Sequence, residues 1–93
     1  MGWEYKIRFS PVEKDRIDKW LREHEHFFRF VDEFASYEFR RPDNTDPKNM
    51  PNLDVRIEED GLYVNNLDSN YMMYDIAHIL LVEYDRIEIA SLD

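Results

Sequence analysis

Hydrophobic and charged residues alternate strictly over residues 3–9, at the start of the chain. Successive side chains of a β-strand point to opposite faces, so this period of two predicts a strand with one apolar face. The residues of that face are Trp3, Tyr5, Ile7 and Phe9. Residues 10–13 then read Ser-Pro-Val-Glu, which is a capping box with proline at the first helical position. A helix is therefore expected to follow the strand at once.

Hydrophobic positions recur with helical spacing after this cap, and the helix is expected to end near His26. Its apolar positions are Ile17, Trp20, Leu21 and Phe27 or Phe28. A second strand is expected at about residues 35–41, where hydrophobic and charged residues alternate again. Three prolines then punctuate residues 42–52, which predicts a loop.

Two further alternating segments, residues 53–59 and 62–65, flank the pair Asp60-Gly61. An Asp-Gly pair between such segments predicts a tight β-hairpin whose two turn residues have positive φ. In the register set by this turn, Ile57 faces Val64 and Glu58 faces Tyr63.

A second helix is predicted over about residues 69–84, and a last strand at residues 86–89. The buried stripe of the helix is expected to be Met73, Ile76, Ala77 and Leu80. Met72 is not expected to be buried together with Met73 against a single sheet. His78 is expected to be a partly buried structural residue.

The expected order of elements is β-α-β-β-β-α-β, in a single globular domain of residues 1–93. The simplest packing of these elements is an α+β fold, a two-layer α/β sandwich related to the ferredoxin-like arrangement. It has a five-stranded mixed sheet with two helices on one face. Both β-α-β units are expected to be right-handed crossovers between parallel strands. The other face of the sheet is then bare, and its outward charges balance.

The net charge of −9 lies entirely in the second half of the chain. Residues 1–41 carry nine acidic and nine basic side chains, whereas residues 42–93 carry twelve acidic and three basic ones. An uneven field selects partners of the opposite sign and speeds their arrival. The charge therefore favours a basic protein partner and argues against nucleic acid and anionic membrane surfaces.

Chain direction in the predicted sheet brings the hairpin turn to the same end as both helix C-termini. The acidic residues expected at this end are Glu23, Glu25, Asp32, Glu33, Glu59, Asp60, Glu83 and Asp85. Carboxylates near a helix C-terminus oppose the helix dipole, which suggests that a function keeps them there. A solvated acidic surface without a partner is the alternative.

Tyrosine side chains extend this predicted binding surface. Tyr71, Tyr74 and Asp75 are expected to face outward at the start of the second helix, and Tyr63 to face outward on the sheet. A tyrosine beside a carboxylate suits an interface, because the ring supplies area and the acid meets Arg or Lys. The predicted partner-binding residues are Glu23, Glu25, Glu59, Asp60, Tyr63, Tyr71, Tyr74, Asp75, Glu83 and Asp85.

Residues suited to catalysis are scarce. The chain has no cysteine, which excludes disulfides, thiolate nucleophiles and cysteine-based zinc sites, and its two glycines cannot form a phosphate-binding loop. His24 and His26 lie two positions apart, so on a helix they point to different sides and do not form a metal pair. Solvated carboxylates at a hairpin turn lack the burial that a general acid needs. We therefore expect no enzyme activity, no cofactor and no metal.

The sequence thus predicts a small acidic binding module that presents acidic and tyrosine side chains to a basic protein, like an inhibitor or an antitoxin- or immunity-type neutraliser. A structural homo-oligomerisation domain is a second hypothesis, and the chain could be a monomer or a homodimer. The third is a small enzyme or ligand binder whose loop 42–52 folds over Asn66, Asp68 and Asn70. A cytoplasmic location is expected, because neither a leader nor an apolar run of about 18 residues is found.

Overall fold

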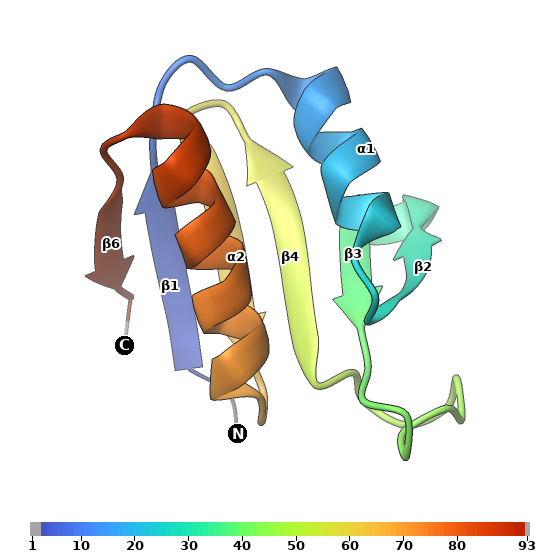
Figure 1. Ribbon diagram of the computed structural model, residues 1–93. Helices are drawn as coiled ribbons and strands as arrows, with labels where there is room; N and C mark the ends of the chain where they lie inside the picture. Colours follow the sequence, from blue (N-terminus) through green and yellow to red (C-terminus); the bar gives the residue numbers. More distant parts are fainter. Residues whose placement is uncertain (1–2, 93) are drawn as a thin grey trace.

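A computed structural model of the protein describes residues 3–92. Within this range it contains six strands, two α-helices and one short 3-10 helix (Figure 1). The strands are β1 (Trp3–Arg8), β2 (Phe27–Val31), β3 (Ser36–Phe39), β4 (Leu53–Glu58), β5 (Gly61–Asn66) and β6 (Glu88–Ser91). The helices are α1 (Lys14–Glu23), η1 (Asp32–Phe34) and α2 (Asn70–Tyr84). The predicted α+β class with two helices is confirmed.

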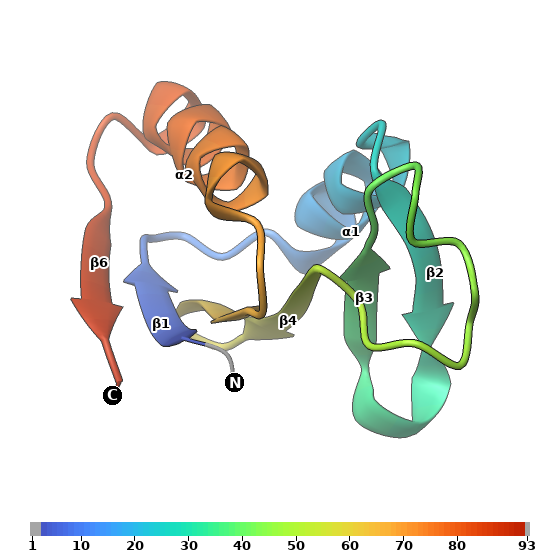
Figure 2. The same ribbon diagram turned by 90° about the horizontal axis from the view of Figure 1, so that it is seen from below.

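The strands form one sheet in the order β2-β3-β4-β5-β1-β6, in which every neighbouring pair is antiparallel. Both α-helices lie on the same side of this sheet, as Figure 2 shows. The sheet therefore has one strand more than predicted and is antiparallel instead of mixed, and the ferredoxin-like order is not confirmed. The first predicted β-α-β unit is wrong, because β3 runs against β1 through the antiparallel pairings of β3, β4, β5 and β1. In the second unit, α2 joins β5 and β6, which run parallel because β1 lies between them and runs against both.

The strand that the pattern missed is β2. The helix α1 ends at Glu23, earlier than the predicted His26, and His24 has extended backbone with ψ of 139°. The next residues, Phe27–Val31, are aromatic or β-branched except for one arginine, and such residues favour a strand. The aromatic residues that seemed to continue the helical stripe therefore form the edge strand of the sheet.

The chain then reverses at η1, where Ala35 has the left-handed conformation with φ of 51°. This reversal is a turn that the predicted order of elements did not contain. Every later strand therefore runs opposite to its predicted direction, and the ends of the molecule gather different residues from those expected.

The predicted β4–β5 hairpin is present, but its register differs by two residues. Ile57 lies opposite Leu62 instead of Val64, and Glu58 lies opposite Gly61 instead of Tyr63. The two turn residues are therefore 59 and 60, and Gly61 is the first residue of β5. The predicted register is wrong, although each side chain keeps its predicted face because the shift is even.

Gly61 is needed for the approach of β1 and not for the turn itself. Its φ is 154°, and it pairs with Arg8 across the β1–β5 ladder. A Cβ at this position would lie 1.9 Å from the carbonyl oxygen of Ile7. Any side chain would therefore overlap with the backbone of the neighbouring strand.

The hydrophobic core lies between the sheet and the two helices. Its fully buried members include Ile7, Leu21, Phe39, Leu53, Val55, Leu62, Val64, Met72, Ile76 and Leu80. Met72 and Met73 are both buried, which corrects the expectation that only one of them would be. Met72 shares a side of α2 with Ile76 and Ile79, and Ile79 lines a cavity together with Ile17 and Trp20 of α1.

The opposite face of the sheet has no helix over it and carries a network of charged side chains. Arg29 contacts Glu38 at 2.9 Å, and Arg40 contacts the same carboxylate at 3.1 Å. Lys6 contacts Glu58 farther along the face. In these pairs, acidic and basic side chains of the helix-free face offset each other's charge.

Candidate functional site

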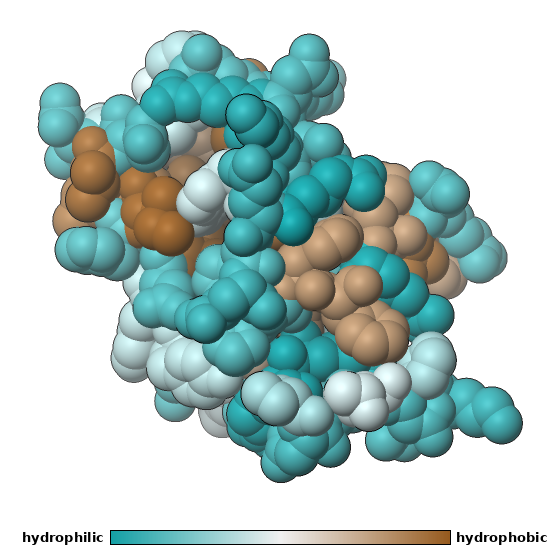
Figure 3. Space-filling view, turned by 45° about the vertical axis from the view of Figure 1, so that its right-hand side comes forward, coloured by the Kyte–Doolittle hydropathy of each residue, from teal (hydrophilic) through white to brown (hydrophobic). Residues whose placement is uncertain are grey.

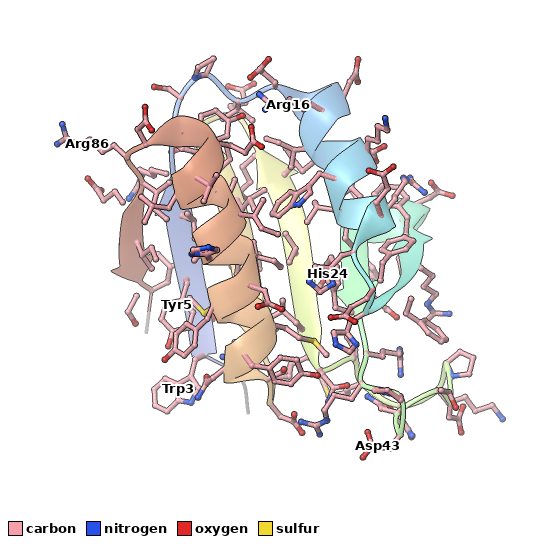
Figure 4. The ribbon with its side chains drawn as sticks, viewed as in Figure 1. Trp3, Tyr5, Arg16, His24, Asp43 and Arg86 are labelled. Atoms are coloured by element: carbon pink, nitrogen blue, oxygen red, sulfur yellow. The ribbon has the colours of Figure 1, made fainter. Side chains whose placement is uncertain are left out.

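The predicted binding residues lie at two opposite ends of the molecule. The upper end, as drawn in Figure 4, is marked by Arg16 and Arg86, and the lower end by Asp43. The upper end holds Glu59, Asp60, Glu83 and Asp85, and the lower end holds Glu23, Glu25, Tyr71, Tyr74 and Asp75. Tyr63 lies between the ends on the helix-free face of the sheet. The predicted convergence of all these carboxylates on one end is therefore wrong.

The physical reason is the direction of the strands. The helix α1 descends from the upper end and α2 ascends to it, so their C-termini lie at opposite ends (Figure 1). The reversal at η1 sends the β4–β5 turn to the upper end with the C-terminus of α2. The C-terminus of α1 is left beside the N-terminus of α2.

Basic side chains neutralise much of the acid at the upper end. The ion pairs there are Lys6–Glu58, Lys6–Asp60 (2.5 Å), Arg8–Asp60 (3.3 Å), Arg8–Glu88 (3.5 Å), Arg16–Glu13 (3.2 Å) and Arg16–Glu83. The hydrogen bond from Lys6 lowers the pKa of the Asp60 carboxyl group. Burial opposes the charge of Lys6, but its bonds to Asp60 and Glu58 outweigh this and raise its pKa. These carboxylates already form ion pairs with basic side chains of the same chain.

At the lower end, Glu25 after α1 and Tyr71 and Asp75 of α2 lie near two histidines, and Glu23 and Tyr74 are exposed on the same two helices. We call this group, made of Glu23, Glu25, Tyr71, Tyr74 and Asp75, the lower surface. Tyr71 and Tyr74 are 46% and 66% exposed, and the three carboxylates are exposed as well. Arg22 and Arg29, the arginines nearest in sequence to Glu23 and Glu25, instead contact Asp18 and Glu38.

His24 and His26 join the two helices at the lower surface. The Nε2 atom of His24 lies 3.7 Å from Oδ2 of Asp75, and Nε2 of His26 lies 3.8 Å from Oε1 of Glu25. The Tyr71 hydroxyl lies 3.4 Å from Nε2 of His26, and the two rings meet edge to face. These contacts hold residues from separate helices in one patch.

The backbone fixes the orientation of His24. The N–H of His26 donates a hydrogen bond of 3.1 Å to Nδ1 of His24, so the neutral ring carries its proton on Nε2, toward Asp75. The ring also packs edge-on against Phe39 of the core. Burial, followed by the nearby His26, lowers the pKa of His24, although Asp75 acts in the opposite direction.

Acidification is expected to destabilise the fold through His24. Because the pKa of His24 is lower in the folded chain than its ordinary value of 6.5, the unfolded chain binds the proton more readily. The contribution of His24 to the stability of the fold is complete above pH 6.5, and it is lost as the pH falls through the lowered pKa of the folded chain. Urea unfolding measures the free energy of unfolding at about pH 7.5 and at about pH 5. Between these pH values, His24→Gln should lose less of this free energy than the wild type.

The exposed His78 supplies the control for this measurement. His78→Gln should retain the wild-type difference between the two pH values. Equal pH dependence in His24→Gln and the wild type would contradict the role given to His24. The exposure of His78 also corrects the expectation that it is partly buried, because it lies opposite the stripe of Met72, Ile76 and Leu80.

The loop at residues 42–52, which the third hypothesis used, borders a cavity of about 370 Å³ at the lower end. Asn52 is 4% exposed and donates to Asp68, whereas Asn66 donates to Asn70. Both carboxylates of this cavity are held by Arg41, at 2.7 Å from Asp68 and 3.6 Å from Asp43. The loop thus meets Asp68 as predicted, but its acidic groups already have a cation.

The spacing of His24 and His26 bears only on metal binding and does not indicate that the two rings lie between the helices. The sequence signal for this position of the histidines is their place just after α1, next to Glu23 and Glu25. Across residues 3–92, no three His, Cys, Asp or Glu side chains gather as they would around a metal ion.

No helix in the described part of the chain is long and apolar enough to cross a bilayer. In comparisons with known proteins, no family model, no curated protein and no solved structure matches the chain.

Proposed function

We propose that the chain is a small acidic binding module whose lower surface docks on a basic protein. The observation that carries this proposal is the junction of the α1 C-terminus with the α2 N-terminus. There the contacts of His24 with Asp75 and of His26 with Tyr71 and Glu25 bring residues of both helices together. Glu23 and Tyr74 are exposed on the same two helices. The predicted site residues of the upper end are left out of this docking surface.

Within residues 3–92, all three carboxylates of the lower surface lack an internal Lys or Arg, whereas at the upper end only Glu59 and Asp85 of the four predicted carboxylates lack one. Glu25 and Asp75 contact only histidines, and no ion pair joins Glu23 to another described residue. At the upper end, Asp60 and Glu83 are paired with Lys6, Arg8 and Arg16. A carboxylate without an internal cation keeps more of its field for an approaching Lys or Arg.

The tyrosines give this surface an apolar contact area that charge alone does not supply. A tyrosine ring buries a large area at low entropic cost and keeps a hydroxyl for hydrogen bonds. The net charge of −9 would steer a basic partner toward the chain, and the lower surface would then fix its orientation. An inhibitor or an antitoxin- or immunity-like neutraliser works in this way, and such a role in the cytoplasm is the function we propose.

Charge reversal on the lower surface tests the proposal. Replacing Glu23, Glu25 and Asp75 together with lysine should weaken binding of the basic partner by about 100-fold or more, because three attractive contacts become repulsive. The partner is captured from a lysate of the source on the immobilised wild-type chain at low salt. Its affinity for each variant is then measured by titration over a salt series.

The matched control reverses Asp32, Glu33 and Glu59, which are exposed and lie outside the lower surface. It changes the net charge by the same amount, so it loses the long-range steering to the same degree. The control should keep most of the affinity and lose mainly association rate. Equal losses in both variants would show that net charge, and not the lower surface, binds the partner.

A further inference from the structure

The guanidinium of Arg22 lies over three aromatic rings on the β2 side of α1. Its central carbon is 4.9 Å from the ring centroid of Phe30, 5.8 Å from that of Tyr37 and 5.9 Å from that of Phe27. These distances fall within the range of about 6 Å over which a cation is attracted by an aromatic face. Its Nε atom also donates to Asp18 at 2.9 Å. Three aromatic rings and the carboxylate of Asp18 thus together bind the cationic side chain of Arg22.

The missed strand β2 is what builds this group. A β-bulge between Phe27 and Arg29 lets Phe27 lie opposite Phe39 and Phe30 lie opposite Tyr37. Both phenylalanines therefore face α1 and pack at the margin of the core. Asp18 and Arg22 are one helical turn apart, so they look toward the same rings.

A second polar contact fixes Asp18 at the edge of the rings. The hydroxyl of Tyr37 donates a hydrogen bond to Oδ1 of Asp18. This bond and that from Arg22 lower the pKa of the Asp18 carboxyl, although partial burial opposes them. Asp18 is therefore an anion held in place from two sides.

An open cavity of about 240 Å³ lies directly beside these residues. It is lined by Lys14, Asp15, Asp18, Phe30, Ala35, Tyr37 and Ile57. Phe30, Tyr37 and Asp18 thus belong both to the cavity and to the group around Arg22. In Figure 3, pale brown hydrophobic atoms gather at the right of the view with hydrophilic atoms among them.

We propose that this cavity binds an alkylammonium group, such as the side chain of a lysine. The methylene chain would pack on Phe30, Ala35 and Ile57, which supply an apolar wall. The ammonium head would lie between the carboxylates of Asp15 and Asp18 and the ring faces, which attract a cation together. Small-molecule sites measure about 300–1,000 Å³, so this smaller space suits one extended side chain.

Two cations of the chain itself border the site and compete with such a ligand. Arg22 lies over the rings and pairs with Asp18, and Lys14 is the basic residue of the cavity lining. Removing either charge should therefore strengthen binding. This expectation separates a specific site from general attraction to an acidic protein, which any loss of positive charge would strengthen equally.

The test follows the NMR signals of Phe30 and Tyr37 while Nα-acetyl-lysine amide is added. Nα-acetyl-norleucine amide, which has a similar shape but no charge, is the neutral control. Arg22→Gln should bind the lysine probe about 3- to 10-fold more tightly than the wild type, because the rings and Asp18 lose their internal cation. Lys19→Gln removes the same charge from the same helix away from the rings and should leave the affinity unchanged.

Loss of affinity is tested with Asp15→Asn, because Asp15 is exposed and its replacement leaves the bond between Tyr37 and Asp18 intact. This variant should bind the probe about 3- to 10-fold more weakly. Putrescine, a free diamine, is titrated in parallel. Tighter binding of putrescine would identify a free amine as the ligand, and tighter binding of the lysine probe would identify a polypeptide side chain.

Three results would overturn the proposal. The first is the absence of shifts at Phe30 and Tyr37 with both amines in folded Arg22→Gln. The second is an equal response to the norleucine probe, and the third is an equal gain in Lys19→Gln and Arg22→Gln. The site lies apart from the lower surface and its test uses small probes, so it stands or fails independently of the proposed protein partner.

Discussion

Gly61→Ala is expected to remove most of the stability of the fold, with a loss of about 4 kcal/mol or more. The new Cβ would lie 1.9 Å from the carbonyl oxygen and 2.9 Å from the carbonyl carbon of Ile7, and 3.0 Å from Cα of Arg8. These are backbone atoms of β1, so no side chain can turn aside to make room. The φ of 154° adds strain for any residue with a Cβ. Domains of this size are stable by about 5–15 kcal/mol, so much of the population should unfold.

Urea unfolding followed by circular dichroism and tryptophan fluorescence measures this loss. Glu59→Ala, in the same turn and exposed, is the control and should change the free energy of unfolding by about 0.5 kcal/mol or less. If Gly61→Ala were as stable as Glu59→Ala, β1 and β5 could not pair in the register described. The order of the central strands would then be wrong.

Arg40→Met is expected to destabilise the fold by about 3–5 kcal/mol. The Arg40 side chain is 2% exposed, and its guanidinium donates to the carbonyl oxygens of Asp46 (2.9 Å) and Asn49 (2.7 Å) in the loop 42–52. It also pairs with Glu38 at 3.1 Å and lies 4.6 Å above the ring of Phe28. When Arg40 is replaced, the loop carbonyl groups lose this hydrogen-bond donor. Glu38 then keeps Arg29 as its remaining cation.

The size of this effect corresponds to a decrease in Tm of about 12–30 °C, which differential scanning calorimetry measures. The double variant Arg40→Met, Glu38→Gln should recover part of the loss, because it removes the carboxylate that the single variant leaves buried. A loss under about 1 kcal/mol for Arg40→Met would contradict the role of Arg40 in holding the loop. An equal loss in the single and double variants would assign the effect to the loop carbonyls alone.

The parts of the fold that the sequence predicted are those governed by local periodicity. The alternation at residues 3–9 and around residues 53–65 identified β1, β4 and β5, and the helical spacing after Ser69 identified α2. The strand β2 could not be separated from α1 in this way, because Phe27 continues the spacing of Trp20 and Leu21. Only its pairing with β3, a contact made in three dimensions, selects the strand.

One missed strand explains most of what was wrong at the candidate site. An added reversal moves the β4–β5 turn to the opposite end, so Glu59 and Asp60 are separated from Glu23 and Glu25. The sequence predicted the tyrosines and carboxylates of the lower surface as binding residues, but it could not show that the end of α1 lies beside the start of α2. The alternation at residues 35–41 likewise does not reveal that the following loop covers Arg40, which is buried.

Cross-linking of carboxylates to amines locates the docking surface most directly. A carbodiimide joins a carboxylate to a lysine only where the two are in contact, and mass spectrometry of the cross-linked complex then identifies the residues. Cross-links from Glu23, Glu25 and Asp75 to lysines of the basic partner are expected. Cross-links concentrated at Glu59, Glu83 and Asp85, or spread evenly over all exposed carboxylates, would contradict it.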